Sequence, residues 1–301
     1  MSLAAAGASS PGPSLRKRLA AHGLDGTTLL VLPGIVTTLL LFVYPFLYGV
    51  VDSLVPKEGP WFANYVKFFS EPFQYNTIFA TLWLALPVTI INVLVAIPIA
   101  FRVRLMRRQR LLTTILVLPV TLGTVLVADG LLNYLGPRGW FNRTLMFLDL
   151  IDHPLRLTNN YWGVFASLVI TGFPFAFLLT LSYVSGIDPA IEQAAATLGA
   201  KARQRFMRIF LPLLAPGLIV TFCLAFVQAF SVFPSAVLLG APSGPTRVIA
   251  IAAYQAAFEQ YDHSMGAAIA IIMGLVQLVV ILAVLSLRQI FYRGPAAGGK
   301  G

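Results

Sequence analysis

The sequence predicts an all-α membrane protein with six transmembrane helices. Of its 301 residues, 58% are hydrophobic and only 11% are charged, an apolar share above that of ordinary soluble domains. A helix that crosses the hydrocarbon core needs ~20 consecutive apolar residues, because the core is ~30 Å thick and the helix rises ~1.5 Å per residue. Runs this long and continuous indicate helices and not barrel strands. Six segments qualify, at 27–50, 77–101, 111–135, 161–185, 213–240 and 264–287.

The charged residues predict how these helices are oriented. No Lys or Arg lies inside a segment, and the one acidic residue inside is Asp129. Fifteen Lys and Arg residues fall on the N-terminus, the 102–110 loop, the 186–212 loop and the C-terminus, against six on the alternate loops. This positive-inside pattern places both termini and the two basic loops in the cytoplasm. Topology therefore explains the net charge of +10, and we expect contact with membrane lipid and none with nucleic acid.

The 102–110 loop, RVRLMRRQR, has two interpretations. The simpler one is topology together with contact to anionic lipid headgroups, and the alternative is a specific functional contact. The ends of the chain are expected to be flexible: a cytoplasmic segment at 1–26, rich in Ala, Gly, Ser and Pro at its start, and a tail at 294–301. Between them we expect one membrane domain at 27–293. The first apolar run is too long for the core of a removable signal peptide.

Sequence motifs for nucleotide binding, hydrolysis and metal binding are absent. The sequence has no glycine-rich phosphate loop, no dinucleotide fingerprint, and no metalloprotease or nucleophile-elbow motif. The three histidines are scattered and Cys223 is the single cysteine, so neither a metal site nor an internal disulfide is expected. We expect no catalytic residue and no cofactor on this chain. Any uphill movement of a solute would draw its energy from a partner or an ion gradient.

A polar stretch interrupts the apolar pattern at 186–212. Asp188 suits a helix N-cap and Pro189 a first helical turn, where a missing N–H costs nothing. A narrow apolar stripe with helical spacing follows, and Gly199 is a natural stop. We therefore expect a short amphipathic helix at 189–198 and a second, basic helix at 201–210 that leads into the fifth span. The alanines of the stripe favour docking in a groove of another protein over lying on lipid.

At this stretch the sequence resembles the permease subunits of binding-protein-dependent ABC importers. Those subunits carry a cytoplasmic loop with Glu-Ala-Ala, a Gly after three further residues, and Ile-x-Leu-Pro starting ten residues after the Gly. The motif's Glu falls here on Gln193, with Glu192 just before it. The resemblance covers roughly 75–290 and is nearest to the polyamine, opine and phosphonate branch, then to the sugar-importer branch. The matching residues are Ala194, Ala195, Gly199, Ile209, Leu211 and Pro212.

The resemblance implies a multi-pass protein of the bacterial inner membrane that forms half of a solute pathway. The loop would be a coupling helix that docks on an ABC ATPase dimer, with ATP and Mg bound by that partner. A second permease, related but not identical, would complete the pathway, and a periplasmic or extracellular solute-binding protein would deliver the solute. ATPase coupling is expected to involve Glu192, Gln193, Ala194, Ala195, Leu198, Gly199, Ile209, Leu211 and Pro212.

Polar residues within the spans are candidates for the solute pathway. Thr221, Gln228, Ser231 and Ser235 have the spacing of one helical face in the fifth span, which predicts either a pathway lining or interhelical hydrogen bonds. Asp129 and Asn133 form an i, i+4 pair in the third span, where a carboxylate is a default site candidate. Interfacial hydration is its alternative interpretation. Asn92 and Gln277 are interpreted as packing contacts, Pro174 as a kink, and loop 136–160 as a weak candidate for binding-protein contact.

Three classes of function compete at this stage. The leading one is a permease subunit for a small polar or cationic solute such as a polyamine, an opine or a phosphonate, with sugars or glycerol phosphate as the alternative. An ion-coupled secondary transporter is the second class, but it usually shows embedded charges or repeats, and this chain has one such carboxylate and no evident repeat. A membrane enzyme is the third, and no catalytic constellation supports it.

Overall fold

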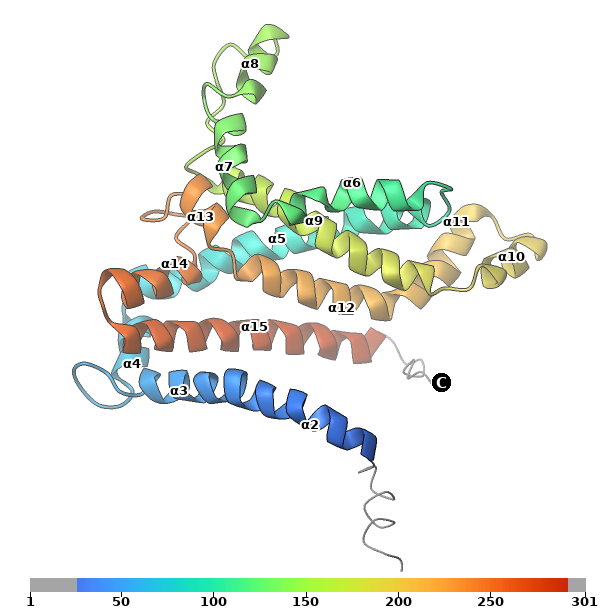
Figure 1. Ribbon diagram of the computed structural model, residues 1–301. Coiled ribbons are helices and arrows are strands. Elements are labelled where there is room, and N and C mark those ends of the chain that lie inside the picture. Colours follow the sequence, from blue (N-terminus) through green and yellow to red (C-terminus); the bar gives the residue numbers. More distant parts are fainter. Residues whose placement is uncertain (1–25, 292–301) are drawn as a thin grey trace, which may run out of the picture. The chain divides into compact units, whose positions relative to one another are not determined.

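The computed structural model describes residues 26–291. This part of the chain consists of helices and connecting turns and contains no β-strand (Figure 1), which confirms the all-α prediction for it. Apart from Gly26, the two predicted flexible ends, 1–26 and 294–301, lie outside the described residues. The chain divides into two compact units, 1–52 and 53–301, which are described separately.

The first unit contains one apolar helix with a π-helical turn in its middle. Helix α2, Gly26–Thr38, continues through η1, Leu39–Val43, into α3, Tyr44–Ser53. In the π turn the Tyr44 N–H donates five residues back to the Leu39 carbonyl. The next residue is Pro45, which has no N–H to offer. The apolar stretch Val31–Ser53 is 23 residues long and meets the requirement for a membrane span.

The second unit is built on long helices that lie side by side in Figure 1. Helices α5, Pro72–Val103, α9, Tyr161–Ser185, and α12, Leu211–Phe230, pack against one another, and α15, His263–Phe291, packs along α12. Short α4, Ala63–Ser70, packs on α5 and α15. Including the first unit, the described residues contain five helices that could cross a membrane, or six if a bent pair counts as one span.

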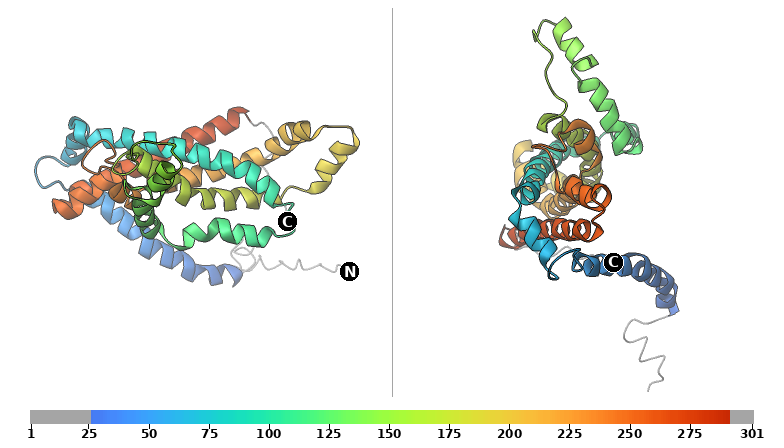
Figure 2. Two further views of the ribbon diagram at one scale, coloured as in Figure 1. Left: turned by 90° about the horizontal axis from the view of Figure 1, so that it is seen from above. Right: turned by 90° about the vertical axis from the view of Figure 1, so that its left-hand side faces the viewer.

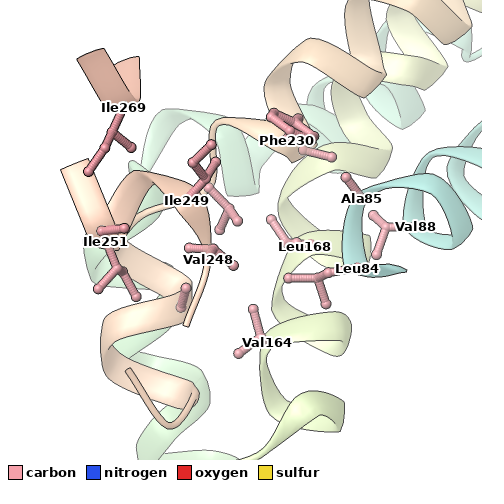
Figure 3. Packing of buried hydrophobic residues seen from close by; sticks show 14 of the residues in the cluster. Leu84, Ala85, Val88, Val164, Leu168, Phe230, Val248, Ile249, Ile251 and Ile269 are labelled. Atoms are coloured by element: carbon pink, nitrogen blue, oxygen red, sulfur yellow. The ribbon is translucent and has the colours of Figure 1, made fainter. Parts of the chain in front are cut away.

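Two apolar clusters hold the long helices together. One gathers residues of α5, α9, α14 and α15 around the end of α12, and Figure 3 shows Leu84, Val88, Leu168, Phe230 and Ile249 among its members. The other lies toward the opposite end of α5 and α9, around Phe177 and Phe210. Close helix approach depends on small residues: a Cβ on Gly217 of α12 would lie 2.4 Å from the Tyr183 ring of α9.

The third predicted span, 111–135, is not one straight helix. Helix α6, Gln109–Thr121, ends before Gly123, and α7, Thr124–Leu135, and α8, Trp140–Phe147, then turn away by 89°. Gly123 has φ +75°, a backbone conformation that only glycine adopts at little cost. Figure 2 shows α7 and α8 leaving the direction of the long helices. The expectation of a continuous helix was wrong because apolar composition carries no information on backbone direction, whereas Gly123 was a usable signal.

The fifth predicted span, 213–240, was placed too far along the chain. The observed helix runs from Ala202 to Phe230 through α11, Ala202–Arg205, η2, Phe206–Phe210, and α12. It stops because the residue before a proline is disfavoured in the α conformation, and Phe233 precedes Pro234 with φ −131°. Pro234 instead opens a separate short helix, α13, Pro234–Leu239. Helices α14, Ile249–Tyr254, and η3, Gln255–Glu259, follow and lead into α15.

Candidate coupling loop and solute cavity

Helix α10, Pro189–Thr197, forms as its sequence predicts. The Asp188 side chain accepts a hydrogen bond from the Ala190 N–H at 2.8 Å, and Pro189 takes the first position. At the other end Gly199 has φ +81°. The Gly199 N–H donates to the Ala196 carbonyl at 3.0 Å, and the Ala200 N–H donates to the Ala195 carbonyl at 3.1 Å. This pair of bonds is a Schellman motif, which needs a left-handed residue at the position of Gly199.

A second helix follows at once and runs into the fifth span. The Gln204 side chain accepts a bond from the Lys201 N–H at 2.9 Å and so helps to start α11. The turn 206–210 is π-helical: the Leu211 N–H reaches back to the Phe206 carbonyl, and Pro212 has no N–H to donate next. The prediction of a basic helix at 201–210 joined to the span is confirmed. Figure 1 shows α10 and α11 at the end of the long helices opposite α13 and α14.

The predicted coupling residues differ in how much they are exposed. Leu198 has 88% of its surface exposed, and Gln193, Ala194 and Gly199 are also exposed, whereas Ala195 is buried at 8%. The predicted apolar stripe therefore does not form a single covered face. The remaining predicted positions lie on the following helix, with Ile209 and Leu211 half-buried and Pro212 exposed.

Glu192 does not stand free beside Gln193. Its Oε2 lies 2.7 Å from Nη2 of Arg104, in an ion pair whose side chains are 7% exposed for Arg104 and 31% for Glu192. Arg104 belongs to the 102–110 loop, for which lipid contact was the simpler interpretation. For Arg104 the structure supports the alternative of a specific contact. Sequence reasoning missed it because five arginines crowd this loop and no pattern distinguishes the buried one.

The polar residues of the fifth span line a cavity of about 390 Å³. Gln228, Ser231 and Ser235 all face it, although the single helical face predicted for them does not exist, because α12 ends at Phe230 and Ser235 lies on α13. Thr221 of the same predicted stripe is buried and donates to the Gly217 carbonyl of its own helix at 3.0 Å. The break between α12 and α13 therefore groups Gln228, Ser231 and Ser235, but not Thr221, around the cavity.

Further polar groups of the cavity come from other helices. Asn92 of α5, Thr124 of α7 and Thr171 of α9 line it. Asn92 is 2% exposed, and its Nδ2 donates to the Leu168 carbonyl at 3.4 Å, while its Oδ1 has no hydrogen-bond partner within the described residues. Asn92 had been interpreted as a packing residue. The sequence did not indicate that Asn92 lines a cavity, because it is a single amide in an apolar span. The cavity also depends on the bend at Gly123, which brings Thr124 to its wall.

Several polar side chains at the cavity wall are already paired. Ser167 and Ser235 share a hydrogen bond of 2.9 Å, and Gln277 of α15 donates to Ser231 at 2.9 Å. Asp129 and Asn133 are exposed on α7 and lie outside the set of residues that line this cavity. Asn133 Nδ2 donates to the Asp129 backbone carbonyl at 3.0 Å. The described residues also contain no group of three or more His, Cys, Asp and Glu side chains arranged to hold a metal.

A buried arginine anchors the loop at the other end of the long helices. Arg247 is 4% exposed, and it donates to the Phe73 carbonyl at 2.9 Å and to Gln255 Oε1 at 2.8 Å. Its guanidinium carbon lies 4.1 Å from the Phe73 ring centroid. Burial lowers the pKa of Arg247, and the nearby charge of Glu259 opposes that shift. Loop 241–248 is thereby fixed to the start of α5.

Comparisons with known proteins agree with this geometry. Residues 77–295 match the family described as the binding-protein-dependent transport system inner membrane component. The spermidine/putrescine transport system permease protein PotB of Haemophilus influenzae is 30% identical over 212 residues, 67% of this chain and 74% of that protein. The probable starch degradation products transport system permease protein AmyD of Thermoanaerobacterium thermosulfurigenes is 24% identical over 286 residues, 87% of this chain and 92% of that protein.

A solved structure shares the fold. One chain of a bacterial alginate ABC transporter, crystallised in complex with an alginate pentasaccharide-bound periplasmic protein, superposes with a TM-score of 0.78 at 22% identity, over 93% of this chain and 99% of that one.

The apolar helices and the family match define this molecule as a multi-pass transport protein of the bacterial plasma membrane. The chain belongs to the family of binding-protein-dependent transport system inner membrane components. It is thus an ABC importer permease, as the loop motif indicated, and the secondary-transporter alternative is set aside.

Proposed function

We propose that this permease couples to a cytoplasmic ABC ATPase through α10 and carries solute past the cavity between α5, α9 and α12. The observation that supports coupling best is α10 itself. It is a short helix with a defined cap at each end, and it exposes Gln193, Ala194 and Leu198 beyond the end of the long helices. Such a helix can enter a groove on another protein at little entropic cost, because its ends are already fixed.

The assembly proposed here has four kinds of component. Both termini and α10 lie in the cytoplasm, where an ATPase dimer binds ATP and Mg and closes on the coupling helices. A second permease, related but not identical, supplies the other half of the pathway. A periplasmic or extracellular binding protein delivers solute at the opposite face, where loop 136–160 is the candidate contact. ATP binding shifts the two permeases between packings, since a ligand favours whichever state it binds more tightly.

A small polar or cationic solute is the first candidate, as the name of the PotB relative suggests for spermidine and putrescine. A neutral, hydroxyl-rich solute such as a sugar is the second. The observation that favours the second is that the polar groups in the cavity lining are uncharged amides and hydroxyls, among them those of Asn92, Thr171, Gln228 and Ser231. The AmyD relative is described as part of a transport system for starch degradation products. Asp129 and Asn133 would contact a cation only along another part of the path.

Co-purification and uptake test this proposal together. The tagged chain is expressed with its neighbouring genes, purified in mild detergent, and reconstituted with ATP inside liposomes. We expect a nucleotide-binding ATPase and a second permease to co-purify, and ATP-dependent uptake of either labelled spermidine or a labelled maltooligosaccharide when the encoded binding protein is added. A chain that purifies alone and shows no ATP dependence would contradict the proposal.

Variants of two polar residues then show which part of the chain contacts the solute. Gln228→Ala removes an amide from the cavity, while Asp129→Asn, outside it, is the matched control for a cationic solute. If the cavity contacts the solute, Gln228→Ala raises the half-saturation concentration and Asp129→Asn leaves it unchanged. The reverse result would move the solute contact to α7.

A further inference from the structure

Arg104 stands where the ends of three helices meet. It is the C-cap residue of α5, so its positive charge lies at the negative end of that helix. Its Nη1 donates to the Val184 carbonyl, in the last turn of α9, at 3.3 Å. Its Nη2 pairs with Glu192, in the first turn of α10, at 2.7 Å. One guanidinium thus joins two membrane helices to the loop helix.

Aromatic packing holds this guanidinium in place. Its carbon lies 4.7 Å from the ring centroid of Phe101 and 4.7 Å from that of Phe210. Phe210 belongs to the π-helical turn η2, and its ring is 4.6 Å from Phe101 between centroids. The π turn therefore adds the start of the fifth span to the cluster. The Arg104 side chain is only 7% exposed, whereas the other arginines of the 102–110 loop are exposed.

The ion pair also determines which side chains of α10 remain available to contact a partner protein. The Asp188 and Thr197 side chains of this region bond to the loop's own backbone, at Ala190 and Ala194. Glu192 bonds outside the loop, to α5. Its charge is therefore used within the chain, and the neighbouring exposed position is the neutral Gln193. Movement of α10 must pull on Arg104 or break a partly buried pair, and breaking such a pair is costly.

We propose that Arg104 is a positioning residue that transmits movement of α10 to the ends of α5 and α9. This inference rests on the proposed coupling of α10 to an ATPase. A rigid link is needed because small shifts at one site reach another only through packed elements with discrete arrangements. The pair Arg104–Glu192 supplies that link, and the cluster of Phe101 and Phe210 extends it to the fifth span.

A double-mutant cycle tests the pair in the intact complex with its ATPase. The variants are Arg104→Ala, Glu192→Ala and the double variant, with Arg107→Ala as control, because Arg107 is an exposed arginine of the same loop. The first readout is amide hydrogen exchange at 189–198. We expect exchange there to rise about tenfold in each single variant, and no further in the double variant, because a charge-assisted hydrogen bond acts as one unit. Exchange at 164–176 of α9 should stay as in wild type.

The second readout is the stimulation of ATP hydrolysis by the encoded binding protein. We expect each single variant to lose most of this stimulation, the double variant to do no worse than Arg104→Ala, and Arg107→Ala to match wild type. Losses that multiply in the double variant, or an Arg104→Ala complex that keeps both slow exchange and full stimulation, would overturn the inference. A third outcome separates the two proposals: the wild-type complex shows no stimulation, but hydrogen exchange at 189–198 changes as expected in the variants. In that case the proposed coupling to an ATPase fails, and the ion pair is shown only to hold α10 in place.

Discussion

Gly199 offers a sharp test of the coupling loop, because its role can be separated from packing. A Cβ built at Gly199 meets no atom of the described residues within 4 Å, so the first side-chain carbon of a substitution has open space. The cost comes from the backbone, since φ is +81° and an L-residue in the left-handed region loses roughly 1–2 kcal/mol. That loss corresponds to an about 5- to 30-fold larger population of the opened turn at the end of α10.

Two substitutions at Gly199 that differ in their tolerance of positive φ test whether the backbone conformation matters. Gly199→Val introduces a β-branched residue that avoids positive φ, whereas Gly199→Asn introduces one of the few residues that tolerate it. Hydrogen exchange at 194–200, measured in the intact complex, should rise strongly for valine and little for asparagine. Binding-protein-stimulated ATP hydrolysis should fall in the same order. Equal behaviour of the two variants, whether both are fast or both are slow, would refute the backbone argument.

Three further outcomes are expected from other sites. Gly217→Ala should lower the Tm of the purified complex by several degrees, because its Cβ would meet the Tyr183 ring at 2.4 Å. Gly274→Ala is the control, because a Cβ there has open space around it and should leave the Tm unchanged. Equal Tm values for the two variants would contradict the packing of α12 against α9. Arg247→Ala should destabilise the fold by about 1–3 kcal/mol in denaturant titration, because it leaves two partly buried acceptors unpaired. An unchanged midpoint would argue against the anchor. Asn92→Ala should change the half-saturation concentration for uptake of the transported probe more than its maximal rate, and an unaltered value would remove Asn92 from the cavity wall.

The capped loop was predictable from local sequence. Asp188, Pro189 and Gly199 each fix a backbone position by their own chemistry, so the start and end of α10 follow from three residues. The first, second, fourth and sixth membrane spans followed from apolar run length, because bilayer thickness sets the length that a span needs. Both predictions use only residues that lie close together in the sequence.

The missed features depend on residues distant in sequence. Arg104 and Glu192 are 88 residues apart, and nothing in the 102–110 loop identifies which arginine turns inward. The cavity needs the breaks at Gly123 and before Pro234, which an apolar count passes over. Gln228, Ser231 and Ser235 line one cavity, but the continuous helix expected to carry them ends at Phe230. Tertiary packing, and not local propensity, decides such positions.

Photo-crosslinking from the tip of α10 tests the central claim most directly. Leu198 is 88% exposed and lies at the C-cap of α10, so a photoreactive side chain there can reach a docked partner without disturbing the fold. Trp140, 73% exposed on α8, is the matched control at a distant surface. In the intact complex we predict that position 198 crosslinks to the ATPase and that position 140 does not. Crosslinking of the ATPase at position 140, or of lipid alone at position 198, would contradict the account.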